Sequence, residues 1–146
     1  MNNRIKTNTL MAILLSGLVQ NVMANEATTL TIDMDGLDSD QGQAIFILMD
    51  SEFSHQGKLP VYIKSAKPIE GGKSQMIFTG IPSGDYSAVI YHDVNNNGEL
   101  DRTFYGMPTE PYGFSNNARG SFGPPDFAES LFHIDDSASH LTITVK

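Results

Sequence analysis

Residues 30–49 read LTIDMDGLDSDQGQAIFILM and hold two different hydrophobic patterns joined by a turn. In the first six residues, apolar and polar side chains alternate, which is the period of a strand with one face in the core. Residues 36–42 are rich in Gly, Asp and Ser, as turns are. The apolar run at 44–49 is too short for a typical helix and rich in β-forming residues. It predicts a strand that is buried on both faces.

Strand patterns continue on the C-terminal side of this stretch. Further strands are predicted at 75–79, 86–91, 131–134 and 141–145, and residues 81–86 form a tight turn that contains Pro and Gly. Residues 51–67 show no clear pattern beyond a loop with one short helix or strand near 61–63. Short strands separated by turns predict an all-β fold, an antiparallel β-sandwich of about seven strands.

The first 24 residues have the organisation of a secretory signal peptide. Two basic residues precede an apolar stretch at 10–19, and Val22-Met23-Ala24 is a typical cleavage site. We expect cleavage to leave a single domain at residues 25–146, located in the periplasm or secreted. No segment is long enough to span a membrane as a helix. The absence of Cys excludes disulfides, an acylated N-terminal cysteine and thiol chemistry.

The chain is acidic, with a formal net charge of −8 at pH 7. All 17 acidic residues follow Ala24, whereas two of the nine basic residues precede it, so the mature chain carries −10. Such a charge disfavours nucleic acid and anionic lipid as partners and favours divalent cations and basic partners. Scattered surface acids can also serve solubility alone.

A second distinctive stretch, DVNNNGELD at residues 93–101, places oxygen-bearing side chains at alternate positions. This is the spacing of a calcium loop, and Gly98 occupies the sixth position, where such a loop turns sharply. We therefore predict calcium as a cofactor. The predicted ligands within the stretch are Asp93, Asn95, Asn97, the Glu99 carbonyl and Asp101.

The stretch also differs from an EF-hand loop. Its twelfth position holds Phe104, which cannot ligate, and predicted strands rather than helices flank it. A calcium site therefore needs a carboxylate from elsewhere, and Glu110, Asp126 and Glu129 are candidates. The alternative is a loop closed by Asx turns without a metal, because Asn, Asp and Gly are also the residues that turns require.

Residues 104–125 form a long segment rich in Gly and Pro, with aromatic residues spread through it. A connection of this length is uncommon in a compact domain and is often functional. We predict that it packs against the sandwich and presents a surface to a protein or glycan, while at least half of the four aromatic side chains of that surface form a small core beneath the loops. The predicted surface residues are Tyr105, Tyr112, Phe114, Asn116, Asn117 and Phe122.

The sequence contains none of the common catalytic motifs: no Gly-x-Ser-x-Gly elbow, no His-Glu-x-x-His and no glycine-rich phosphate loop. His92 and Asp93 are adjacent in a predicted strand and should point to opposite faces. We therefore expect a non-catalytic module. Two alternatives are a hydrolase that uses a metal or a carboxylate pair, and a structural subunit of an envelope assembly held by strand addition.

The chain resembles the bacterial family known as domain of unknown function 2141. The residues that carry the resemblance are Gly42-Gln43, Pro82-Ser83-Gly84-Asp85-Tyr86-Ser87-Ala88-Val89, the stretch from His92 to Asp101, the stretch from Gly106 to Asn117, and Gly123-Pro124-Pro125-Asp126-Phe127. The family usually has Ala where this chain has Ser87.

The resemblance implies an exported, uncharacterised β-sandwich, similar in outline to transthyretin-like and immunoglobulin-like Greek-key domains, and it implies no activity. It also implies that two long loops lie together at one end of the sandwich. We expect residues 108–117 to pack beside residues 93–101, so that Glu110 approaches the ion and Asn116 or Asn117 contributes an amide oxygen.

Overall fold

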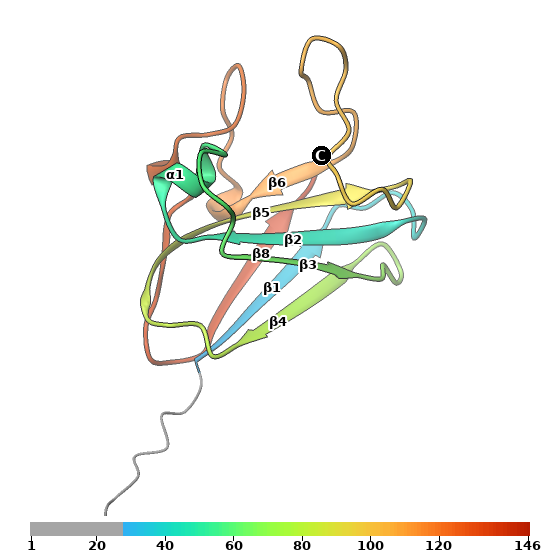
Figure 1. Cartoon of the computed structure of the whole chain (residues 1–146). Helices are drawn as coiled ribbons and strands as arrows, with labels where there is room; N and C mark the ends of the chain where they lie inside the picture. Colours follow the sequence, from blue (N-terminus) through green and yellow to red (C-terminus); the bar gives the residue numbers. More distant parts are fainter. Residues whose placement is uncertain (1–27) are drawn as a thin grey trace, which may run out of the picture.

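A computed structural model of the protein describes residues 28–146, which form two β-sheets packed face to face (Figure 1). The predicted signal peptide lies outside the described residues. The strands are β1 (Thr29–Asp35), β2 (Gln43–Met49), β3 (Ile63–Lys67), β4 (Ser74–Thr79), β5 (Gly84–Asp93), β6 (Tyr112–Phe114), β7 (Phe132–Ile134) and β8 (Ser139–Thr144). The helical segments are α1 (Glu52–His55), η1 (Ser115–Asn117) and α2 (Phe127–Ser130). The all-β sandwich predicted from the sequence is confirmed.

One sheet has the strand order β4-β1-β8, and the other has the order β3-β2-β5-β6, with β7 pairing with the first residues of β5. Most neighbours are antiparallel, but β1 and β8 run parallel, with Leu30 opposite Ser139 and Asp35 opposite Thr144. A parallel pair needs a long connection instead of a hairpin. Here that connection contains β4 and the whole of the other sheet, because β1 and β8 are the first and last strands of the described chain.

The core lies between the two sheets and follows the predicted alternation. Leu30, Ile32 and Met34 of β1 are buried, and they pack with Phe46 of β2 and Ile90 of β5 in one cluster. The outward-facing residues of β1 are only half-buried. β2 is covered on its second face as well, since its residues at 45 and 49 are also buried. The continuous apolar run therefore marks the central strand, as its pattern predicted.

The segments with the weakest sequence patterns form short elements. Residues 51–67 contain α1, capped by Ser51, whose Oγ accepts the Ser54 N–H at 3.2 Å, and then β3. The Gly/Pro-rich segment is interrupted by β6, a three-residue strand that pairs with β5 and was not predicted. Two long loops rise from the sheet edge that β6 forms, one before β6 and one after η1 (Figure 1). In the part of the chain described, no helix has the length and hydrophobicity needed to cross a membrane.

Candidate functional site

Residues 93–101, the oxygen-rich loop, begin at the last residue of β5. Gly42 lies against this point with φ of +79°, and a Cβ there would lie 2.1 Å from the Asp93 carbonyl oxygen, so only glycine fits. Within the loop, Asn96 and Gly98 adopt φ values of 59° and 77°. These two residues reverse the chain in a backbone region that Asn and Gly tolerate best. Local sequence therefore fixes where the loop starts and turns.

The Asp93 carboxylate is the anchor of the loop. It is fully buried, and its Oδ2 accepts hydrogen bonds from Gln43 Nε2 at 2.7 Å and Gly98 N at 2.8 Å, while Oδ1 accepts Asn97 N at 3.1 Å. Burial alone would raise the pKa of Asp93, but the bonds from Gln43, Gly98 and Asn97 outweigh it and hold the pKa below its usual value. The group is therefore a stable anion at neutral pH.

Three further predicted ligands converge beside this anchor. Asn95 Nδ2 donates to Asp101 Oδ2 at 2.7 Å, and Asn97 Nδ2 donates to Asp101 Oδ1 at 2.9 Å. The two amide oxygens accept backbone N–H groups two residues ahead, from Asn97 at 3.0 Å and from Glu99 at 2.8 Å, as in Asx turns. Glu99 thus takes part through its backbone, and its side chain is exposed.

Glu110 closes the loop from the following segment. It is buried, and its two carboxylate oxygens accept the Val94 N–H at 2.9 Å and the Asp101 N–H at 3.0 Å. Thr109 N also donates to Asp101 O at 2.8 Å, so the two segments are joined through backbone as well. The predicted approach of Glu110 to residues 93–101 is thus present in the structure.

One side of the oxygen-rich loop is closed by Tyr91 and Lys64. The Gly98 carbonyl accepts the Tyr91 hydroxyl at 2.8 Å and Lys64 Nζ at 2.5 Å. Burial first, and then the carboxylates of Asp93 and Glu110, raise the pKa of Tyr91 to about 12. This hydroxyl therefore stays protonated and serves as a hydrogen-bond donor.

The donor set of the loop fits a hard cation. Within residues 28–146, no three His, Asp or Glu side chains cluster as a metal site. The available ligands are instead single carboxylates combined with Asn amides and backbone carbonyls, which is the mixture that calcium accepts and zinc does not favour. The hydrogen bonds leave acceptor capacity, because a carboxylate has about four lone-pair sites and an amide oxygen has two.

The structure does not bring Asn116 and Asn117 to the oxygen-rich loop. Asn116 Nδ2 donates to the carbonyls of Glu129 and Leu131, at 3.2 and 2.8 Å, and Asn117 Oδ1 accepts the Thr144 N–H at 2.9 Å. The expectation that either would supply an amide oxygen to the ion is wrong. Since β6 runs antiparallel to β5, with Tyr112 opposite Tyr91 and Phe114 opposite Val89, the chain leads away from Asp93 before η1 begins.

Asp126 and Glu129 are also engaged elsewhere. They form the capping box of α2, in which Glu129 Oε2 accepts the Asp126 N–H at 3.0 Å. Of the three distant carboxylates considered from the sequence, Glu110 alone lies at the oxygen-rich loop.

The aromatic residues of the predicted surface divide into two pairs. Phe114 is buried, and Tyr112 is half-buried with its ring against Phe114 at 6.1 Å and Arg119 over its other side at 5.9 Å. Tyr105 and Phe122 are exposed at the two long loops. The expectation that at least half of these side chains pack beneath the loops is confirmed, and Tyr112 and Phe114 are not free surface residues.

A comparison with family models agrees with this geometry. Residues 32–142 match the family described as "Uncharacterized protein conserved in bacteria (DUF2141)". The chain belongs to this family. The match includes both sheets, the oxygen-rich loop and Glu110, so the fold and the loop described above are a DUF2141 structure. No curated protein and no solved structure matches the chain.

This DUF2141 domain contains a buried polar cluster that the sequence analysis did not single out. His55 Nδ1 contacts Ser87 Oγ at 3.2 Å, Ser87 Oγ contacts Ser130 Oγ at 2.8 Å, and Ser115 Oγ accepts the Ala88 N–H at 3.0 Å. The three serines are completely buried. They join α1, β5, η1 and α2 beneath the long loops. Ser87, at the position where the family usually has Ala, was the one sequence signal that could have pointed to the cluster.

The histidines have ordinary structural partners. His92 is buried and contacts the Gln41 carbonyl through Nε2 at 2.5 Å, while its neighbour Asp93 faces the loop, as strand geometry predicted. His133 and His140 pair with Asp85 and Asp33 at 2.7 and 2.6 Å on exposed strand surfaces.

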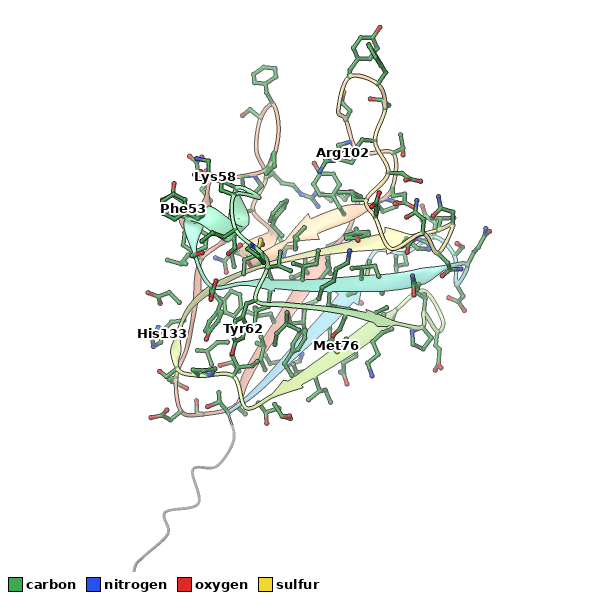
Figure 2. All side chains as sticks on the ribbon, in the orientation of Figure 1. Phe53, Lys58, Tyr62, Met76, Arg102 and His133 are labelled. Atoms are coloured by element: carbon green, nitrogen blue, oxygen red, sulfur yellow. The ribbon has the colours of Figure 1, made fainter. Side chains whose placement is uncertain are left out.

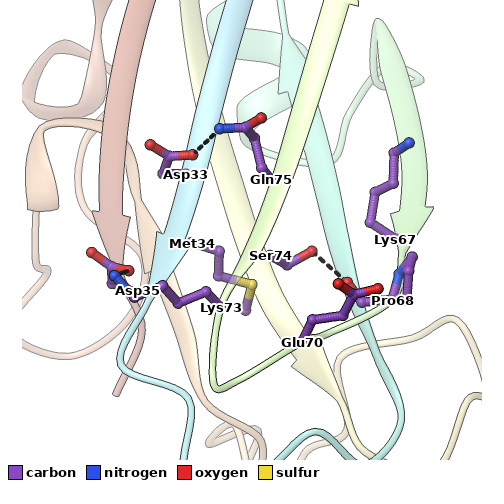
Figure 3. Close-up of a pocket in the computed structure, with 9 residues that line it drawn as sticks. All are labelled: Asp33, Met34, Asp35, Lys67, Pro68, Glu70, Lys73, Ser74 and Gln75. Carbon is purple, nitrogen blue, oxygen red and sulfur yellow. Dashed lines mark hydrogen bonds and ion pairs between the residues drawn. The ribbon is translucent and has the colours of Figure 1, made fainter.

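A hollow of about 490 Å³ lies at the edge of the sandwich, where β3 and β4 separate (Figure 3). Three of its charged side chains have partners within the hollow: Asp33 accepts Gln75 Nε2 at 2.7 Å, and Lys73 lies 3.4 Å from Asp35. The hydrogen bond from Gln75, followed by that from His140, lowers the pKa of Asp33. Asp33 is therefore an anion near neutral pH and is not poised there as a general acid or base.

Proposed function

We propose that this protein is an exported, non-catalytic β-sandwich module whose oxygen-rich loop binds calcium and thereby fixes the two long loops for contact with a partner. The observation that carries the proposal is the convergence of Asp93, Asn95, Asn97 and Asp101, closed by the distant carboxylate of Glu110. Localisation in the periplasm or outside the cell is proposed from the signal-peptide pattern alone.

The hydrogen bonds already present support a calcium role, because they hold the donors in position before an ion arrives. Asp93 cannot swing away without breaking its three bonds to Gln43, Asn97 and Gly98. A preorganised site loses less conformational entropy on binding. Two of the side-chain donors are neutral amides, so the affinity should be modest, and calcium outside the cytoplasm is plentiful enough to fill such a site.

The absence of catalysis is supported by the protonation states of Asp93 and Tyr91 at the loop. A general acid or base at neutral pH needs a pKa near 7. The pKa of Asp93 is instead lowered, and that of the neighbouring Tyr91 is raised to about 12. Both groups are therefore fixed in one protonation state across the physiological range.

Thermal unfolding with calcium and with chelator tests the proposal. Calcium at about 100 times its dissociation constant should stabilise the folded protein by about 2.7 kcal/mol. The same concentration of magnesium should do less, because Mg²⁺ prefers a rigid octahedral shell and keeps its waters. Unchanged melting at millimolar calcium would refute the metal site.

Glu110→Gln identifies the closing carboxylate. The substitution keeps the shape of the side chain but removes its charge, so calcium affinity should fall at least about tenfold. Glu70→Gln removes one charge from an exposed position outside the loop and is the matched control. Equal affinities in the two variants would remove Glu110 from the ion's shell.

A further inference from the structure

Four large apolar side chains stand fully or largely in solvent at the two long loops. Phe104, Tyr105 and Met107 have exposed fractions of 97%, 87% and 68%, and Phe122 on the second loop has 106%. Figures 1 and 2 show both loops projecting well beyond the sheets on the side of the sandwich where β6 forms the sheet edge. Aromatic side chains placed this far from any core are normally explained by a partner.

The first projecting loop, residues 102–108, is a braced hairpin. Thr103 N donates to Met107 O at 2.8 Å, Gly106 N donates to Thr103 O at 2.8 Å, and Arg102 pairs with Pro108 at its base. Met107 N also donates to Thr103 Oγ1 at 3.2 Å. The apolar tip is therefore held away from the sandwich. Its stem begins directly after Asp101 of the oxygen-rich loop.

The charge around the tips differs from that of the rest of the chain. Residues 102–109 and 118–125 contain no Asp or Glu, although the protein has 17 of them, and each segment carries one arginine. Arg102 is exposed at the base of the hairpin, and it donates from Nη1 to the Gly106 carbonyl at 3.0 Å, which fixes its guanidinium against the hairpin (Figure 2). Guanidinium groups bind phosphate in a bidentate manner.

We propose that the two loop tips dock on a phospholipid bilayer, with Phe104, Tyr105, Met107 and Phe122 entering the headgroup region and Arg102 binding lipid phosphate. Aromatic rings favour this boundary. The tips lie on separate loops, so they can enter a fluid interface without a partner of matching shape. The net charge of −10 weighs against attraction to an anionic surface as a whole, so the contact rests on apolar insertion and on the phosphate that every phospholipid carries.

The inference deepens the proposed function, and it rests on it in one respect. The carboxylates of Asp93, Glu99 and Asp101 belong to the oxygen-rich loop from which the first hairpin rises, and the carboxylate of Glu110 is bonded to the backbone of that loop. A bound calcium ion would cancel part of this negative charge. Docking on vesicles that contain anionic lipid should therefore be stronger with calcium than with chelator, whereas docking on zwitterionic vesicles should depend little on it.

The chain has no Cys, so one introduced cysteine can carry an environment-sensitive dye at a chosen position. We would label full-length Met107→Cys and Ser121→Cys for the two tips, and Ile77→Cys as an exposed site on β4 of the opposite sheet. Vesicles of phosphatidylcholine, and of phosphatidylethanolamine with phosphatidylglycerol, are added. The fluorescence emission of the dyes at the two tips should shift to the blue, and the emission of the dye at position 77 should not. The apolar stretch at residues 10–19 could itself bind the vesicles. Each dye reports only its own surroundings, so binding through residues 10–19 would not produce a difference between the tips and position 77.

Replacing Phe104 and Phe122 with Ser should raise the lipid concentration at half-maximal dye shift at least about tenfold, since burying one Phe side chain corresponds to a factor of roughly ten or more. Ile77→Ser is the control and should leave the lipid concentration at half-maximal dye shift unchanged. Three results would overturn the proposal and favour a protein or glycan partner. They are no change in dye emission at either tip, equal changes at all three positions, and a lipid dependence that the Phe substitutions leave unchanged. Calcium-dependent melting without dye shifts would overturn docking alone, and dye shifts without calcium-dependent melting would overturn the calcium site alone.

Discussion

Asp93→Asn is the sharpest test of how the oxygen-rich loop is built. The substitution preserves the volume of a completely buried side chain and changes only its charge and one oxygen. In the native loop, Oδ2 accepts two hydrogen bonds, from Gln43 and Gly98, and Oδ1 accepts one, from Asn97. The best orientation of the new amide keeps its oxygen at the Oδ2 position and turns its NH₂ group toward the Asn97 N–H.

The expected loss of stability follows from these three bonds. A hydrogen bond to a charged group contributes about 1.5–3 kcal/mol, and one between neutral groups about 1 kcal/mol. Two bonds become neutral, at a cost of about 1 kcal/mol each. The third is lost at a similar cost, because Asn97 N keeps a second acceptor in Asn95 Oδ1 at 3.0 Å. The free energy of unfolding should therefore fall by about 3 kcal/mol, and the melting temperature by about 10 °C.

Urea unfolding in the presence of chelator measures this change without any contribution from a bound ion. Asp38→Asn, at an exposed position of the turn between β1 and β2, is the control and should change the free energy of unfolding by less than about 0.5 kcal/mol. If Asp93→Asn were as mild as Asp38→Asn, the buried carboxylate would not be the anchor of the loop.

Three further results are expected. Because the folded pKa of Asp93 lies below 3.8, the carboxylate's contribution to the free energy of unfolding is present above that pH and is lost as pH falls through the folded pKa. In acid titrations followed by circular dichroism, the stability of Asp93→Asn should therefore depend less steeply on pH below pH 4 than that of the wild type. Gly42→Ala should destabilise the protein by more than about 2 kcal/mol in urea unfolding, because the new Cβ would clash with the Asp93 carbonyl. Gly57→Ala is the control: with φ of +70° and nothing within 4 Å of its Cβ, it should show only the conformational cost of about 1 kcal/mol. Equal effects of the two substitutions would contradict the clash. Ser115→Ala should lower the free energy of unfolding by about 1–3 kcal/mol in thermal unfolding, since it leaves the buried Ala88 N–H without its acceptor. Ser121→Ala, at an exposed site, is the control, and an equal effect of the two substitutions would argue against the buried cluster.

The candidate site shows where local patterns suffice. Asp93, Asn95, Asn97 and Asp101 belong to one loop, and their alternation with Gly98 at the turn was enough to predict their convergence. Asn116 and Asn117 were placed wrongly, because their position depends on the direction in which β6 pairs with β5. A three-residue strand inside a Gly/Pro-rich segment leaves no periodic pattern from which that direction could be predicted.

Hydrogen-bond partners that are distant in sequence could be identified only from the tertiary structure. Gln43 lies 50 residues before Asp93, yet it donates one of the three bonds that hold the carboxylate. The cluster of His55, Ser87 and Ser130 joins segments 32 and 43 residues apart. Hydroxyl and imidazole groups have no characteristic spacing in sequence, so only their arrangement in space reveals that they contact one another.

The sequence by itself determined most of the strands, the burial of residues 44–49 on both faces and the turning points of the oxygen-rich loop, because side-chain alternation and backbone preferences act over a few neighbouring residues. Only the tertiary structure decided that β8 lies parallel to β1, that Glu110 closes the loop, and that Tyr105 and Phe122 remain in solvent while Phe114 is buried. These outcomes depend on which surfaces remain uncovered after the two sheets have packed. Burial of apolar area is a property of the assembled sandwich and cannot be assigned to any one segment.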